Sequence, residues 1–190
     1  MLIVDGFDQS VEQVYELIRT VYYESDMPAF FPDDDFPEPA AFAHWIAALK
    51  QRSGAILLAV KRESDLVGFL ILEPGEYADE RDAVLKIGLL ASCQRQGMGT
   101  RLLEHAFSLA REEGRVETVL VALRPGNTGA MRLFEKTGMQ RETGAGRERA
   151  ATAPDDEFLL VLDLDKYAPP ADLAGGLQMG DRTRLQSRSI

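Results

Sequence analysis

Gly97 and Gly99 stand where an apolar stretch, AVLKIGLL, passes through a polar turn into a helical pattern that begins near Thr100. Glycine at such a junction lets backbone N–H groups approach a ligand without side chains in the way. The N–H groups at the start of a helix carry partial positive charge, and Arg95 and Arg101 add cations on either side. The chemistry that these residues suit is the binding of an anion, and a phosphate or pyrophosphate is the natural ligand.

The residues around the two glycines narrow the choice of phosphate ligand. A Walker loop requires Lys and then Ser or Thr directly after its last glycine, whereas Thr100 and Arg101 follow Gly99. A dinucleotide fingerprint requires Gly or Ala where Leu102 stands, and an acidic residue at the end of the next strand, which instead ends in VLVALRPGN. ATP, GTP and NAD are therefore disfavoured, although nucleotide binding by a Rossmann-like domain stays open as an alternative.

A second block follows this loop in the sequence. After Gly114 come a β-rich run, VETVLVAL, the turn RPGN and a short amphipathic pattern, TGAMRLFEKTGM. Together, the pattern Gln-x-x-Gly-x-Gly from Gln94 to Gly99 and this second block resemble the two cofactor-binding segments of the GNAT acyltransferase superfamily. The residues of the second block that match the family are Asn127, Ala130, Leu133, Phe134, Glu135, Lys136 and Gly138.

The resemblance implies a ligand and a set of residues that bind it. The ligand is acetyl-CoA or another acyl-CoA, and its pyrophosphate lies on the loop of the first block. In the family the strand before this loop parts from strand 119–123, and the exposed backbone pairs with amides of the pantetheine arm. The predicted cofactor-binding residues are Leu89, Leu90, Ala91, Gln94, Arg95, Gln96, Gly97, Met98, Gly99, Thr100, Asn127, Ala130 and Phe134.

The resemblance also implies the route of the reaction. An amine attacks the thioester carbonyl directly, and the backbone N–H near Leu90 stabilises the oxyanion of the tetrahedral intermediate. Asn127 looks like a residue that hydrogen-bonds the cofactor arm, but its type and position suit the N-cap of the next helix equally well. Both roles of Asn127 stay open.

The aromatic residue of the second block departs from the family. Many relatives have Tyr there, which protonates the departing CoA thiolate, whereas Phe134 has no proton to donate. A positioned acid contributes about 10² to 10⁴ in rate, yet a thiol of pKa about 8.5 leaves tolerably as a thiolate. We therefore expect slower chemistry or another proton donor, for which Tyr22, Tyr23, Tyr77 and a water molecule are the candidates.

The family's usual positions for a general base hold no acid. Relatives often have Glu on one of the two parting strands, but the corresponding residues are Ala83 and Ala122. An amine of pKa about 10.4 is mostly protonated at neutral pH and must lose a proton before attack. Glu73, Glu80 and Asp82 are the candidate bases, acting through water; the alternative is that each is a solvated surface carboxylate.

The stretch between the first two helices is the candidate acceptor site, because in the family these helices wall the acceptor pocket. We expect Asp33, Asp34 and Asp35 to attract a cationic amine and Phe31 to form part of an apolar wall. The alternative is a solvated acidic loop. The spacing around His44, His105 and Cys93 fits neither a metal site nor a catalytic triad, so we predict no metal.

The composition is that of an ordinary globular domain. The chain has 190 residues, of which 45% are hydrophobic and 27% charged, and no apolar run approaches the roughly 20 residues of a membrane span. The net charge of −10 argues against nonspecific binding to nucleic acid and favours a cationic small molecule or basic peptide, although acidity that only aids solubility is an alternative. A single cysteine and an N-terminus unlike a secretion signal indicate the cytoplasm.

The periodicity of the chain predicts a mixed α/β domain. A strand at 1–7, helices at 11–24 and 40–50 and a hairpin at 55–75 precede the phosphate loop, and two further strands follow Gly138. This order matches the fold that the resemblance implies. The GNAT fold has a central mixed, mostly antiparallel sheet with one parallel, splayed pair of strands, flanked by helices.

The sequence divides into a domain and a tail. We expect the acyltransferase domain to cover residues 1–167, because residues 168–190 show little periodicity. A tail that becomes ordered usually docks on another surface, and dimerisation of two copies through this tail is a hypothesis.

The leading interpretation of function is an enzyme: an N-acetyltransferase that moves an acetyl group from acetyl-CoA to a primary amine of a small molecule or peptide. The alternative is an acyl-CoA-binding sensor or interaction module, which the missing Tyr and Glu favour. Both predict cofactor binding, so turnover distinguishes them. The acceptor stays open among a polyamine, an amino acid, an antibiotic and a protein N-terminus.

Overall fold

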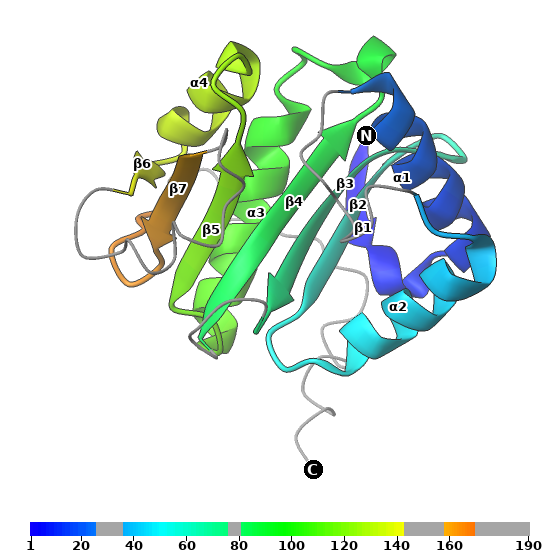
Figure 1. Ribbon diagram of the computed structural model, residues 1–190, viewed down its shortest axis with the longest axis horizontal. Coiled ribbons are helices and arrows are strands. Elements are labelled where there is room, and N and C mark those ends of the chain that lie inside the picture. The colour runs from blue at the N-terminus through cyan, green and yellow to red at the C-terminus, as the bar shows by residue number, and fades with distance from the viewer. Residues whose placement is uncertain (26–35, 76–80, 143–157, 170–190) are drawn as a thin grey trace.

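The computed structural model describes residues 1–25, 36–75, 81–142 and 158–169. In that part, the chain forms one seven-stranded sheet with helices on both faces (Figure 1). The strands are β1 (Leu2–Asp5), β2 (Ile56–Arg62), β3 (Asp65–Pro74), β4 (Asp82–Leu89), β5 (Thr118–Leu123), β6 (Gln140–Arg141) and β7 (Phe158–Asp163). The helices are α1 (Val11–Glu24), α2 (Pro39–Gln51), α3 (Met98–Glu113) and α4 (Thr128–Lys136), with 3-10 turns η1 (Gly6–Asp8) and η2 (Ala91–Cys93).

The sheet is antiparallel except for one pair of strands. Its order is β1-β2-β3-β4-β5-β7-β6, and only β4 and β5 run parallel among these described strands. The middle of β3 is inaccessible to solvent on both faces, since Phe69, Leu70, Ile71 and Leu72 are all 0% exposed. Helices therefore have to cover both faces. The predicted mixed sheet with one parallel pair is confirmed.

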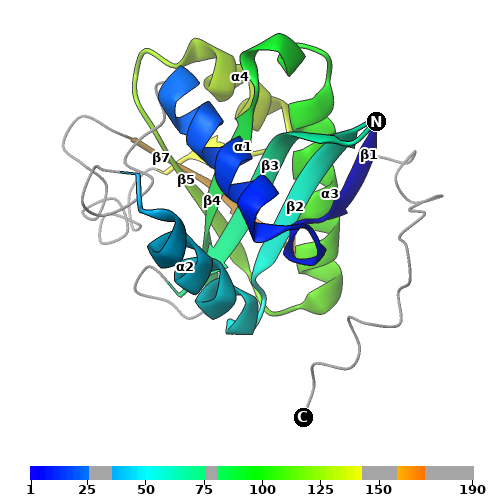
Figure 2. The same cartoon turned by 90° about the vertical axis from the view of Figure 1, so that its right-hand side faces the viewer.

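Helices α1 and α2 cover one face of the sheet (Figure 2). Helix α1 starts after Ser10, whose Oγ accepts a hydrogen bond from the Gln13 N–H at 3.4 Å. Helix α2 starts at Pro39. Proline has no backbone N–H, but an N–H in the first turn would have no acceptor within the helix, so no hydrogen bond is lost. Both helices were predicted, and both are confirmed. Their buried residues recur at helical spacing: Val14, Leu17, Ile18, Val21, Phe42, Ile46 and Leu49.

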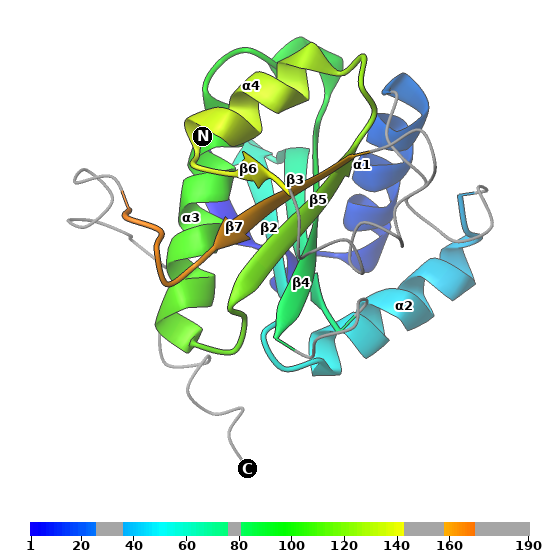
Figure 3. The ribbon, with the colours of Figure 1, turned by 60° about the vertical axis from the view of Figure 1, so that its left-hand side comes forward.

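Helices α3 and α4 lie on the opposite face (Figure 3). Helix α3 packs along the sheet through Leu102, Leu103 and Phe107, which are 0% exposed. It ends at Gly114, which takes the left-handed φ of 63° that such a helix end requires. This helix fixes the direction in which the predicted phosphate loop points, because the loop is its N-terminus.

The last strands do not follow chain order. Strand β7 lies between β5 and β6 and pairs antiparallel with both. The weak strand predicted after Met139 is confirmed as the two-residue β6, and the stronger closing strand as β7. The described part of the chain contains no helix with the length and apolarity to cross a membrane. Residues 170–190 lie outside the described residues, so the tail and the dimer stay predictions.

Candidate functional site

Strands β4 and β5 separate along their length and leave a gap in the sheet. They pair only at Asp82 with Thr118, Ala83 with Val119 and Val84 with Leu120. Beyond these pairs β4 continues beside β3, and β5 beside β7. Figure 1 shows the two strands together at their lower ends and apart at their upper ends. The splayed pair was predicted from the resemblance, and the strand pairing agrees with it.

The backbone N–H of Leu90 points away from this gap. It donates to the Val67 carbonyl at 3.0 Å, and at the other end of β4 the Asp82 carbonyl accepts from the Gly75 N–H at 3.1 Å. Both bonds run toward β3, so even-numbered residues of β4 face β3 and odd-numbered ones face β5. The Leu90 N–H is therefore not the open donor that was expected. The N–H groups of Ile87 and Leu89 face the gap instead.

The loop after β4 is held by its own glutamines. Gln94 Nε2 donates to the Leu89 carbonyl, and Gln96 Nε2 donates to the Ser92 carbonyl, both at 3.1 Å. These side chains brace the chain between β4 and α3 rather than reaching out toward a ligand. Arg95 adopts a left-handed φ of 58°, which turns the backbone sharply within the loop.

The N-terminus of α3 is open. Gly97 precedes it with a φ of 79°, and no side chain caps it. The first bond of the helix runs from the Arg101 N–H to the Gly97 carbonyl at 3.2 Å. The N–H groups of Met98, Gly99 and Thr100 come before that bond and have no intrahelical acceptor. Such a row of donors at the positive end of a helix dipole suits a phosphate.

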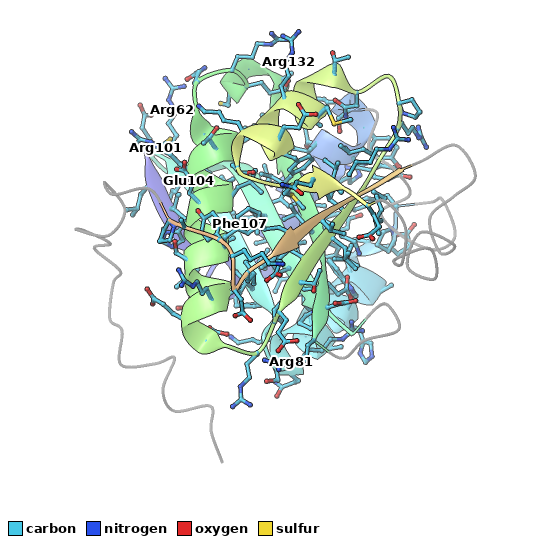
Figure 4. All side chains as sticks on the ribbon, turned by 90° about the vertical axis from the view of Figure 1, so that its left-hand side faces the viewer. Arg62, Arg81, Arg101, Glu104, Phe107 and Arg132 are labelled. Carbon is cyan, nitrogen blue, oxygen red and sulfur yellow. The ribbon has the colours of Figure 1, made fainter. Side chains whose placement is uncertain are left out.

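The side chain of Arg62 places a positive charge beside the N-terminus of α3. A cavity of about 230 Å³ is lined by Met1, Arg62, Gln96 and Met98. Figure 4 shows Arg62 and Arg101 at the end of the molecule where α3 begins, and Arg81 at the opposite end. Arg62 was missed in the sequence because it closes β2, far along the chain from the loop.

Helix α4 starts at Asn127 beside the gap. Asn127 Oδ1 accepts a hydrogen bond from the Ala130 N–H at 3.0 Å, so the N-cap role of Asn127 is present. Phe134, further along the helix, is 2% exposed and lies in the core cluster on the α3 side of the sheet. At this position the protein has an apolar ring and no hydroxyl.

The carboxylate of Glu73 is engaged at both oxygens. Its Oε1 accepts from Arg52 Nη1 at 2.9 Å and from Trp45 Nε1 at 3.3 Å, and its Oε2 accepts from Lys86 Nζ at 2.8 Å. The side chain is also buried, at 5% exposure. Because both oxygens are engaged by donors inside the fold, Glu73 ties α2 to the sheet. These contacts disfavour Glu73 as a base, and that role stays a prediction.

Asp82 is far from the open end of the gap. It opens β4 at the end where β4 and β5 are paired, whereas Leu89 closes the strand. Seven residues of extended chain separate them, about 23 Å. This separation disfavours Asp82 as a base at the open end of the gap, and that role stays a prediction. Glu80, Tyr77, and the acceptor residues Phe31, Asp33, Asp34 and Asp35 lie outside the described residues.

The C-terminal turn of α1 reaches the end of β4. The Ala91 N–H donates to Glu24 Oε2 at 3.2 Å. Nearby in α1, Tyr22 packs against the ring of Phe36, with centroids 5.4 Å apart, and Tyr23 is 68% exposed. Glu24 was missed because it ends a helix nearly seventy residues before its partner, and no local pattern joins the two.

Comparison with known proteins adds a family and a fold. A family model described as "Acetyltransferase (GNAT) family" matches residues 11–139. N-alpha-acetyltransferase 50 of Danio rerio is 26% identical over 98 residues, which are 52% of this chain and 57% of that protein. Probable N-acetyltransferase san of Drosophila melanogaster is 24% identical over 86 residues, 45% of this chain and 47% of that protein. The match thus spans about half the length of these two relatives.

A solved structure shares the fold over nearly the whole chain. YncA, a putative acetyltransferase from Salmonella typhimurium with its cofactor acetyl-CoA, superposes with a TM-score of 0.70 at 16% identity. The likeness covers 90% of this chain and 97% of that one. The two chains therefore share the overall fold.

Proposed function

We propose that this protein, which belongs to the acetyltransferase (GNAT) family, moves an acetyl group from acetyl-CoA to a primary amine of a small molecule or peptide. The observation that carries the proposal is the open start of α3 beside the gap between β4 and β5. The two features lie at opposite ends of the short connection from Leu89 to Gly97. A ligand with an anionic group at one end and a hydrogen-bonding arm at the other can use both.

The residues present fit acetyl-CoA. The N–H groups of Met98, Gly99 and Thr100 suit its pyrophosphate, and Arg62 and Arg101 suit further negative charge. The N–H edge of Ile87 and Leu89 suits the amides of the pantetheine arm. Acetyl-CoA supplies a thioester whose acyl carbon is open to attack by an amine.

The chain's contribution to the chemistry is electrostatic and positional. An N–H of Ile87 or Leu89 donates to the carbonyl oxygen of the thioester and stabilises the negative charge that develops there in the tetrahedral intermediate. The amine nitrogen bonds to the acyl carbon and gives up a proton to water, the carbon–sulfur bond breaks, and the electron pair leaves on sulfur. Phe134 donates no proton to that sulfur, and a thiolate of pKa about 8.5 leaves without one at a lower rate.

The acceptor amine must come from the face opposite α3. Helices α3 and α4 occupy one face of the sheet, so a ligand held at the start of α3 reaches the gap from that side. The opposite face at the end of β4 is bordered by α1. The acidic stretch Asp33 to Asp35 follows α1 in the sequence, and its attraction for a cationic amine stays part of this proposal.

A binding module without turnover is the second candidate. The buried phenyl ring of Phe134 favours it, because the family's usual proton donor is absent. Ala83 and Ala122 also lack the carboxylates that many relatives carry there. A protein of this kind binds acyl-CoA without turning it over, and acts as a sensor of acyl-CoA or as an interaction module.

Calorimetric titration with acetyl-CoA, followed by a free-thiol assay against a panel of primary amines, tests the proposal. We expect saturable binding and thiol release that depends on the amine. A sample with acetyl-CoA and no amine controls for simple hydrolysis. Binding without amine-dependent release would support the module instead, and no binding at all would contradict both functions.

A further inference from the structure

The carboxylate of Glu24 lies at the open end of the gap. The Ala91 N–H, two residues beyond Leu89, donates to Glu24 Oε2 at 3.2 Å. The Leu89 N–H faces the gap, and two residues of extended chain span about 7 Å. Glu24 Oε2 therefore lies within about 10 Å of the Leu89 N–H, a span that an amine and one water molecule can bridge.

Packing fixes the C-terminal turn of α1 in this position. A Cβ built on Gly88 would overlap Val21 Cγ1, so the helix and the strand approach as closely as a glycine allows. Val21 is 1% exposed and belongs to the core cluster beneath α1. Glu24 follows Val21 by one helical turn. Its backbone is thus held by the core, although its side chain is exposed. Figure 1 shows the end of α1 beside the upper end of β4.

Two of the carboxylates considered as bases, Glu73 and Asp82, do not share this position. Glu73 is enclosed by Arg52, Lys86 and Trp45, and Asp82 lies at the far end of β4. Within the described residues, Glu24 Oε2 accepts a hydrogen bond from a backbone amide, and the side chain is exposed. A carboxylate in this setting can accept a proton from an ammonium group directly or through a water molecule.

We propose that Glu24 is the general base of this acetyltransferase, an inference that rests on the proposed function. The acceptor ammonium loses one proton to Glu24, and the freed lone pair forms the bond to the acyl carbon. The nitrogen then loses a second proton to water, the carbon–sulfur bond breaks, and its electron pair leaves on sulfur. Glu24 returns its proton to the thiolate or to water, so the carboxylate is restored for the next turnover.

The Glu24→Gln variant tests this role without removing the contact to Ala91. The glutamine carbonyl oxygen can still accept the hydrogen bond from the Ala91 N–H. The variant therefore loses the basic carboxylate but keeps the contact between α1 and the end of β4. We expect kcat to fall by about 10²-fold or more. We also expect the rate of the variant to keep rising with pH toward the pKa of the amine, because only the free amine then reacts. The Kd for acetyl-CoA should stay within twofold.

Two further variants sharpen the test. Glu16→Gln changes another exposed carboxylate of α1, which pairs with Arg19, and should leave both the rate and its pH profile unchanged. Glu24→Asp restores a carboxylate on a shorter side chain and should recover part of the rate. The measurements are the thiol-release rate from pH 6 to 9.5 and the calorimetric Kd for acetyl-CoA.

The outcomes separate this inference from the function on which it rests. A Glu24→Gln variant with wild-type kcat and pH profile would overturn the role of Glu24 and leave the acetyltransferase intact. Loss of acetyl-CoA affinity together with rate would also overturn it, since the carboxylate would then be part of the ligand site. A wild-type protein that binds acetyl-CoA and releases no thiol with any amine would overturn the proposed function, and Glu24 with it.

Discussion

Glu73 Oε2 accepts a hydrogen bond from Lys86 Nζ at 2.8 Å on the buried face between β3 and β4. Arg52, which directly follows α2, donates to the other oxygen at 2.9 Å. The Glu73→Gln variant leaves Lys86, 12% exposed, with a neutral partner in the core. We expect the free energy of unfolding to fall by about 2–4 kcal/mol, since the partly exposed Arg52 can turn to water. Urea denaturation followed by circular dichroism measures it.

The matched control for Glu73 is Glu16→Gln, because Glu16 and Arg19 form an exposed pair on α1. Loss of this ion pair should lower the free energy of unfolding by less than about 0.5 kcal/mol. Thiol release by Glu73→Gln, measured well below its melting temperature, should stay within about twofold of wild type. A large loss of kcat with unchanged stability would indicate that Glu73 takes part in catalysis.

Gly97→Ala should reduce both stability and acetyl-CoA affinity. A φ of 79° costs an L-residue about 1–2 kcal/mol, and relief of that strain moves the donors at the start of α3. Loss of one hydrogen bond to a charged group corresponds to about 10-fold or more in Kd. Gly114→Ala is the control, because Gly114 has a φ of 63° at the other end of the same helix. If the two variants lose affinity equally, the loop is not the phosphate site.

Asn127→Ser separates the two roles that the sequence left open. Serine keeps an N-cap oxygen but has no amide, so stability should stay within about 0.5 kcal/mol of wild type. Asn127→Ala removes the acceptor of the Ala130 N–H and should cost about 1 kcal/mol. We expect the acetyl-CoA Kd of the serine variant to match wild type, as measured by calorimetry. A raised Kd at unchanged stability would assign the amide to the cofactor arm.

Arg62→Gln should weaken acetyl-CoA binding by about 3- to 10-fold at low salt. Arg62 is exposed beside the open end of α3, so its attraction for a phosphate is screened and shrinks as salt rises. Arg81→Gln is the control, since Arg81 pairs with Glu117 at the opposite end of the molecule (Figure 4). Calorimetry at two salt concentrations measures the effect. An Arg62 variant that binds like wild type at low salt would remove this residue from the ligand site.

His105 should make stability depend on pH. Burial lowers the pKa of His105, which is 3% exposed on α3, below its usual value. The unfolded chain takes up a proton near pH 6.5 that the folded protein resists. Stability is therefore lost as pH falls below about 6.5, with a slope of at most about 1.4 kcal/mol per pH unit. Melting temperatures of His105→Gln between pH 7.5 and 5.5 should fall less steeply than those of wild type.

The control for His105 is His44→Gln, which changes an exposed histidine of α2. Its melting temperature should follow the wild-type slope. Only the slope is compared, because either substitution also changes stability at every pH. Equal slopes for wild type and His105→Gln would show that the buried imidazole is not the cause.

Local patterns in the sequence predicted the elements well. Ser10 and the apolar spacing of α1, Pro39 at the start of α2, and Gly97 before α3 each act within one or two helical turns, so neighbouring residues reveal them. The Leu90 N–H, predicted as the donor, bonds to the Val67 carbonyl instead of facing the gap. The direction of an N–H depends on the pairing of β4 with β3, which counting from a motif does not provide.

The rest of the candidate site depends on contacts between distant segments. Arg62 lies beside the N-terminus of α3, and Glu24 accepts a hydrogen bond from the Ala91 N–H. Both contacts exist only because the fold brings together segments that are far apart in the sequence. In the sequence, Glu73 could be interpreted as a solvated carboxylate or as a base. Its partners Trp45 and Arg52 come from α2 and the residue that caps it, so they could not be recognised near Glu73. No pattern along one segment contains such information.

The position of β7 has a consequence for a growing polypeptide on the ribosome. Strand β5 pairs with β4 at three residues and with β7 at six, and β7 is the last described strand to be synthesised. A nascent chain that has emerged only as far as Arg141 already contains the whole phosphate loop, but one wall of the gap still lacks its main support. The pairing of β5 with β7 can therefore be complete only after Asp163 has emerged.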